Sequence, residues 1–159
     1  HRPNEAFIPA VEEAFGKESV IVVQDALGGQ PIQRWYKHWK DPQGAAPETT
    51  GDLYDRLMSK VKPAIEGEEL ASVSFFWMQG ERDANGGAHA AYKDALKQLI
   101  SNLRRDLKRP DMNVFIGRIG DYALDRESCV TVRKVQHEIS NEDPHGAWVD
   151  VDDLNDRMP

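Results

Sequence analysis

The chain has 159 residues and a mass of 18.0 kDa, which is the length of one domain and enough to bury a hydrophobic core. Its formal net charge of −7 argues against nucleic acid or an anionic membrane surface as a partner. The single cysteine, Cys129, excludes an internal disulfide and a cysteine-based zinc cluster. No apolar run approaches the roughly 20 residues that a membrane span requires.

The first half of the chain predicts two helices and one strand. Asn4 can cap a helix whose apolar side chains share one face, and Gly16 is placed to end it. Residues 19–26 (SVIVVQDA) are β-branched and nearly uncharged, so we expect a buried strand that leads into Gly28 and Gly29. The segments that follow are a loop rich in proline, glycine and threonine and an amphipathic helix, at residues 41–51 and 53–65.

The second half alternates strands and helices more regularly. Short apolar strands are predicted at residues 71–78, 112–119 and 147–151, with amphipathic helices from Gly87 to Leu107 and around residues 129–139. This alternation predicts a parallel sheet that is covered on both faces. The binding crevice of such a sheet lies outside the carboxyl ends of its strands, which is where we look for function.

A glycine pair, Gly28 and Gly29, follows the first predicted strand. The sequence GGQPIQRW fits neither common phosphate-loop pattern, and Pro31 removes a backbone donor, which argues against a nucleotide or flavin binder. Two roles stay open. The pair can form a tight turn that needs a positive φ, or it can present a bare backbone N–H to an oxyanion.

The segment FWMQGERDA, residues 76–84, places one amide and two carboxylates directly after an apolar strand. Gln79 can donate a hydrogen bond there, and Glu81 and Asp83 can accept them. A purely structural role is equally open, in which Asp83 caps a helix and Glu81 pairs with Arg82.

Together these segments resemble the sialate O-acetylesterase-like branch of the SGNH/GDSL hydrolases. That branch carries GG-x-x-I-x-x-W after a strand, as in residues 28–35, and W-x-Q-G-E-x-D-A, as in residues 77–84. A later R-x-x-Q on a helix is similar to residues 133–136, and a D-L pair after a strand is similar to Asp153-Leu154. The motifs keep the order of the family over nearly the whole chain.

The resemblance implies a flavodoxin-like, three-layer α/β/α sandwich with a parallel sheet. It implies an enzyme that removes acetyl groups from sugars through an acyl-serine, without a metal or cofactor. Gly29 and Gln79 correspond to the oxyanion donors, and Glu81 to an acidic organiser of the catalytic site. Gly28, Trp35 and Asp83 are expected to contact the substrate. The implied partner is an acetylated carbohydrate, with no nucleic acid or membrane, and a secreted or periplasmic location is slightly favoured.

The sequence departs from the family at both ends. It contains neither the G-x-S-N or G-D-S segment that carries the nucleophilic serine nor the D-x-x-H segment that carries the base. The family places these segments upstream of His1 and beyond Pro159. We therefore expect residues 1–159 to form one hydrolase domain that is incomplete at both ends and inactive by itself.

An alternative is a non-catalytic descendant of the same fold that binds carbohydrate. Trp35 and Trp39 belong to an aromatic cluster whose rings can stack on a sugar or pack over a neighbouring helix. We also expect Glu81 to be held inward, by backbone amides or by Arg133, because an unpaired buried carboxylate is costly. The late acidic residues lack the glycine and spacing of a calcium loop and predict a solvated strand end; they are Asp150, Asp152, Asp153 and Asp156.

Overall fold

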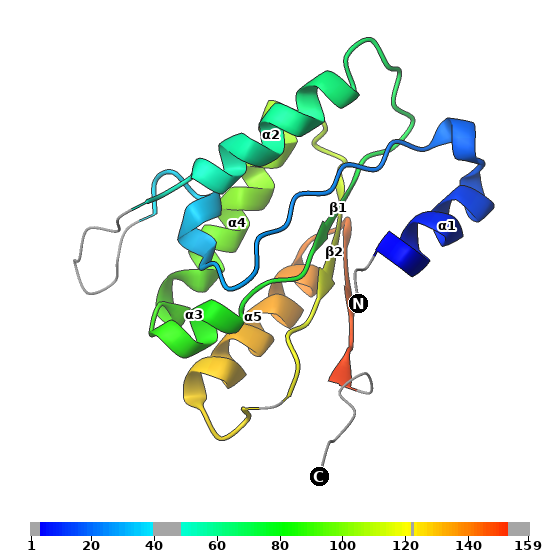
Figure 1. Ribbon diagram of the computed structural model, residues 1–159. Coiled ribbons are helices and arrows are strands. Elements are labelled where there is room, and N and C mark those ends of the chain that lie inside the picture. The colour runs from blue at the N-terminus through cyan, green and yellow to red at the C-terminus, as the bar shows by residue number, and fades with distance from the viewer. Residues whose placement is uncertain (1–3, 40–48, 122, 153–159) are drawn as a thin grey trace.

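A computed structural model describes residues 4–39, 49–121 and 123–152 (Figure 1). The helices are α1 (Asn4–Phe15), α2 (Asp52–Ala64), α3 (Glu81–Gly86), α4 (His89–Asp106) and α5 (Glu127–Glu142), with short 3-10 helices η1 (Lys17–Ser19) and η2 (Ile32–Trp35). The strands are β1 (Ser74–Trp77), β2 (Asn113–Gly117) and β3 (Gly146–Val149). The four predicted helices and the three later strands are confirmed, whereas the short helix α3 was not anticipated.

The strands form a parallel sheet in the order β1-β2-β3. Phe75 of β1 pairs with Val114 of β2, and Trp77 pairs with Ile116. Because the strands are parallel and successive side chains alternate between faces, these four side chains point to the same face of the sheet. The carboxyl ends of all three strands therefore meet at one edge.

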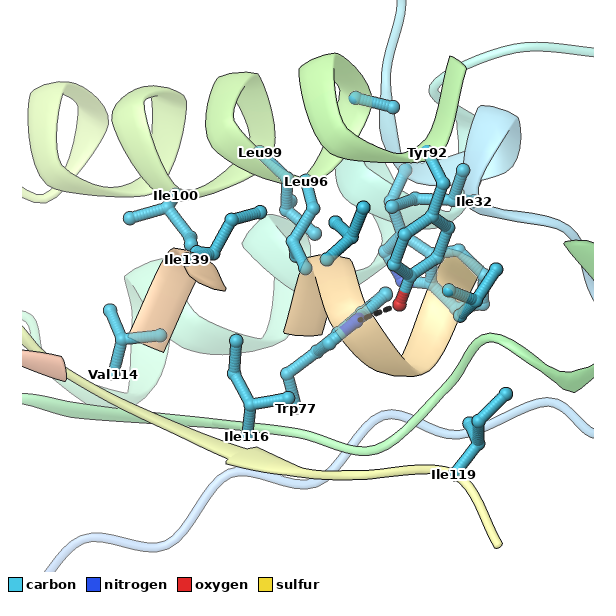
Figure 2. Packing of buried hydrophobic residues seen from close by; sticks show 14 of the residues in the cluster. Ile32, Trp77, Tyr92, Leu96, Leu99, Ile100, Val114, Ile116, Ile119 and Ile139 are labelled. Atoms are coloured by element: carbon cyan, nitrogen blue, oxygen red, sulfur yellow. Dashed lines mark hydrogen bonds between the residues drawn. The ribbon is translucent and has the colours of Figure 1, made fainter. Parts of the chain in front are cut away.

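That inner face carries the main hydrophobic core, which α4 and α5 cover (Figures 1 and 2). Leu96 and Leu99 of α4 and Ile139 of α5 pack over the sheet and are almost completely buried. Burying each such side chain stabilises the fold by about 1.5–3 kcal/mol. Within this core the indole N–H of Trp77 donates to the hydroxyl of Tyr92, as Figure 2 shows.

Helix α1 lies on the opposite side of the sheet from α4 and α5 (Figure 1). Phe7 of α1 contacts Phe76 of β1 edge to face, with ring centroids 4.7 Å apart. Phe76 in turn stacks on Phe115 of β2 at 4.9 Å. Helices on both faces of a parallel sheet confirm the three-layer α/β/α architecture.

The expected strand at residues 19–26 is wrong. Residues 20–27 run extended without a strand partner, and the side chains of Ile21 and Val22 are 45% and 39% exposed. The segment is fixed to α2 instead, because the carboxylate of Asp25 accepts hydrogen bonds from Arg56 Nε and Lys60 Nζ. The expected loop lies mostly in residues 41–48, outside the described residues, and its last residue, Gly51, precedes α2.

Candidate functional site

The candidate site lies where two turns meet at the carboxyl edge of the sheet. One turn follows β1 at Gln79 and Gly80, and the other contains Gly28 and Gly29 after the extended segment. Gln79 Nε2 donates to the backbone carbonyl of Gln30 at 2.9 Å, which joins the two turns directly. This contact confirms that the two turns lie together, as predicted, although the segment that leads into Gly28 is not a strand of the sheet.

Asp83 links the same two turns from beneath. It is 0% exposed on α3, and both of its carboxylate oxygens accept the backbone N–H of Ile32, at 3.1 and 3.2 Å. It also accepts a hydrogen bond from Gln79 Nε2. Burial raises the pKa of Asp83 to about 6, against the opposing effect of these hydrogen bonds. Asp83 is therefore placed to hold the turns together, and not at the surface where we expected it to contact a substrate.

In the side-chain amide of Gln79 the nitrogen is hydrogen-bonded and the oxygen is not. Its two N–H groups serve the carbonyl of Gln30 and the carboxylate of Asp83. Its Oε1 is buried and has no hydrogen-bond partner in the part of the chain that the structure describes. The backbone carbonyl of Gln79 accepts from Tyr92 at 2.7 Å and from Gln136 at 2.8 Å, so the main chain here is fixed as well.

Gln136 organises the site from α5, a role that the sequence motif alone did not reveal. The residue is 0% exposed, and its Nε2 donates to the carbonyl of Gln79 and to the Tyr92 hydroxyl. Its Oε1 accepts from the backbone N–H of Ile119 at 3.0 Å, just after β2. One amide thus joins the ends of two strands. The available signal was a polar residue in the apolar stripe of a helix, since buried polar groups need partners.

Gly80 occupies a position that a side chain cannot share. Its φ is +149°, and a Cβ atom there would lie 2.8 Å from Val132 Cγ1, 3.1 Å from Gln136 Nε2 and 3.2 Å from Ile119 Cγ2. The carbonyl of Gly80 accepts from the N–H of Ala84 at 2.8 Å, which begins α3. A glycine therefore lets the chain turn from β1 into α3 directly above α5.

The expectation that Glu81 is held inward is wrong. Its side chain is exposed, and no described residue makes a hydrogen bond or an ion pair with it. Arg133 donates instead to the backbone carbonyl of Ile119 and to the carboxylate of Asp152, at 2.6 Å from Nη2. The structure thus gives Glu81 no contact through which it could organise a catalytic site.

The carboxylates after β3 are ion-paired and still partly solvated, with the side chains of Asp150 and Asp152 50% and 28% exposed. Asp152 also accepts from Arg118 at 2.9 Å, and Arg118 reaches Asp150 at 2.6 Å. The hydrogen bond from the Arg133 guanidinium holds the pKa of Asp152 below its ordinary value. Asp153 and Asp156 lie outside the described residues, as does Leu154. Within the described ranges no group of three or more potential metal ligands comes together.

The tryptophans expected at a sugar surface lie in the core. Trp35 is 5% exposed and contacts Trp77 edge to face at 5.2 Å, and Trp39 is 6% exposed. Their rings pack inside the protein, which supports the packing interpretation over stacking on a sugar.

Helices of the described part of the chain lack the combination of length and apolar character needed to cross a bilayer.

The glycine turn, by contrast, is open. Gly28 and Gly29 are both exposed, and Gly29 has a φ of +69°. The backbone N–H of Gly29 has no hydrogen-bond acceptor among the described residues. Two hollows, of about 700 Å³ and 240 Å³, lie elsewhere, between α4 and α5 and beside Trp35. Neither Gly28 nor Gly29 lines either of these two hollows.

Comparison with known proteins agrees with this geometry. A parallel sheet between helices, with polar turns at its carboxyl edge, defines an α/β protein and is consistent with the SGNH hydrolase fold. The family model "Carbohydrate esterase, sialic acid-specific acetylesterase" matches residues 2–158, so the chain belongs to that family. No curated protein matches the chain.

A solved structure shows the same fold. A protein from Arabidopsis thaliana, determined by X-ray crystallography, superimposes with a TM-score of 0.72 at 24% sequence identity. The alignment covers 95% of this chain and 56% of the Arabidopsis chain. This chain therefore spans little more than half the length of that relative.

Proposed function

We propose that this chain is the central part of a carbohydrate O-acetylesterase that works through an acyl-serine, with nucleophile and base outside residues 1–159. The observation that carries the proposal is the N–H of the exposed residue Gly29, which has no acceptor in the described structure and lies in a turn that is hydrogen-bonded to Gln79. A fixed donor of this kind, at the carboxyl edge of a parallel sheet, is suited to a developing negative charge. Family membership supports an ester as the substrate.

The proposed chemistry is acyl transfer in two steps. The serine oxygen bonds to the acetyl carbon while its proton passes to a histidine, and the sugar hydroxyl leaves with that proton. Water then releases acetate by the same route in reverse. Gly29 N–H would donate to the tetrahedral oxyanion, and Gln79 Nε2 would join it by exchanging the carbonyl of Gln30 for the substrate oxygen. The other groups hold these two donors in place.

The test is a matched assay with a chromogenic acetyl ester and an O-acetylated sugar. Residues 1–159 alone should show no hydrolysis above background, because no activated nucleophile is present. A longer protein that includes the flanking segments should cleave both substrates. In that longer protein Gln79→Ala should lower kcat by about 10²–10³-fold, the usual effect of removing one oxyanion donor.

Three outcomes would contradict the proposal. Turnover by residues 1–159 would place the nucleophile within this chain. Unchanged kcat in the Gln79→Ala protein would remove Gln79 from the oxyanion site. A longer protein that binds sugar without hydrolysing it would instead identify the non-catalytic descendant. An Asp94→Asn variant serves as the matched control for Gln79→Ala, because it alters an exposed polar side chain of α4 that makes no hydrogen bond with the candidate site.

A further inference from the structure

We infer that Asp83 is a positioning residue, whose carboxylate decides which end of the Gln79 amide faces inward and ties that amide to the glycine turn. The term "positioning" rests on the proposed function, whereas the contacts themselves do not. Among the described residues of the motif, Asp83 is completely buried and its side chain bonds both to Ile32, after the glycine turn, and to Gln79.

The orientation follows from what a carboxylate can do. An ionised carboxylate only accepts hydrogen bonds, so every polar group that faces it must be a donor. Ile32 supplies its backbone N–H, and Gln79 supplies one N–H of its amide. The amide oxygen is thereby turned away from the Asp83 carboxylate and is left buried without a partner among the described residues. The second N–H of Gln79 is directed to the carbonyl of Gln30 as a consequence.

Without the Asp83 carboxylate, the observed orientation of the Gln79 amide would be unfavourable, because its oxygen has no hydrogen-bond donor among the described residues. A buried acceptor that lacks a partner costs about 1–3 kcal/mol, so the amide would turn over if another donor faced it. Asparagine at position 83 supplies such a donor in nearly the same shape. Its oxygen can still accept from Ile32, while its NH₂ group would meet the Gln79 NH₂ group. Gln79 then rotates to present Oε1, and its bond to Gln30 is lost.

Asp83→Asn therefore separates positioning from folding. The Ile32 contact and the local packing survive, but the Gln79 amide reverses. Nuclear magnetic resonance of the ¹⁵N-labelled protein reports both events. In the wild type at neutral pH, we expect the Gln79 side-chain N–H signals to be shifted downfield and to exchange slowly with water. In the Asp83→Asn protein these signals should move and exchange at least tenfold faster, while the Ile32 amide stays protected.

The matched control is Glu81→Gln, which removes a carboxylate two residues away on the same short helix. It should leave the Gln79 signals nearly unchanged, because Glu81 is exposed and makes no hydrogen bond with a described residue, and because loss of its charge favours the ionised form of Asp83. Unchanged Gln79 signals in Asp83→Asn would overturn the inference. If that variant does not fold, the wild type decides: a through-bond coupling between Gln79 ¹⁵Nε2 and the Asp83 carboxylate carbon is expected, and its absence beside a visible Ile32 coupling overturns the inference.

An activity measurement on the longer protein separates this inference from the proposed function. If that protein is an esterase, Asp83→Asn should lower kcat by about 10²-fold with KM within about twofold, because an oxyanion donor is misdirected while binding is retained. If that protein is inactive, the magnetic resonance experiment still tests whether Asp83 orients the Gln79 amide. The proposed function fails in that case, and the positioning of Gln79 is judged separately.

Discussion

Replacing Gly80 with alanine is expected to lower the free energy of unfolding by about 2–5 kcal/mol, the sum of backbone strain and overpacking. The φ of +149° is a conformation that residues with a side chain rarely adopt. The added methyl group would also press on Val132, whose Cγ1 is 2.8 Å from the Cβ position. Val132 is fully buried on α5 and cannot move away without disturbing the core.

Alanine substitutions at two other glycines distinguish the effect of backbone strain from the effect of steric crowding. Gly67 has a φ of +81° with open space around it, so Gly67→Ala should cost only about 1–2 kcal/mol from the backbone. Gly28 lacks both the positive φ and any neighbour within 4 Å, so Gly28→Ala should leave stability almost unchanged. Urea denaturation of the three variants provides the comparison. A Gly80→Ala cost no larger than that of Gly67→Ala would show that the site is not crowded.

The contribution of Asp83 to stability is expected to grow as the pH falls from 7 to 4. Burial raises the pKa of Asp83 in the folded state to about 6, above the ordinary value of 3.8. Between these two values the folded protein binds a proton that the unfolded chain does not, so acid favours folding. The shift in pKa corresponds to a gain of about 3 kcal/mol at most in the free energy of unfolding. This gain is fully present below pH 4 and is lost as the pH rises through 6.

Asp83→Asn isolates this effect because asparagine does not titrate. The comparison is needed since other carboxylates act in the opposite direction: ion pairing lowers the pKa of Asp111 to about 2 and also lowers that of Asp152. The wild type should therefore gain stability relative to Asp83→Asn between pH 7 and pH 4. Urea denaturation at four pH values measures the difference. A difference that stays constant over this range would contradict the buried, ionisable state of Asp83.

Local patterns predicted most of the fold. The helices α2, α4 and α5 follow from apolar residues at intervals of three and four, and β1 to β3 from short apolar runs between them. Residues 19–26 have the same strand-like composition but form no strand. Composition expresses a preference for the extended conformation, whereas a strand also requires a hydrogen-bonded neighbour from elsewhere in the chain. That neighbour cannot be identified from local composition.

The sequence correctly predicted that the two polar turns lie together, but it did not predict which of the two carboxylates is buried. Glu81 and Asp83 are both in the first turn of α3, which the sequence did not predict. An α-helix turns by about 100° per residue, so two residues apart they point in nearly opposite directions. Without the helix, Glu81 was expected to point inward and Asp83 to contact a substrate. With it, one enters the protein and the other faces water.

The edge of β1 has a consequence for the behaviour of this chain in solution. In the described structure β1 pairs with β2 alone, and Phe76 and Met78 beside that edge are 52% and 61% exposed. An unpaired strand edge flanked by apolar side chains is a template for pairing with other molecules. The net charge of −7 opposes such association by repulsion between copies. Because salt screens that repulsion beyond about 10 Å at 0.1 M, residues 1–159 should stay dispersed at low ionic strength and associate progressively as salt is added.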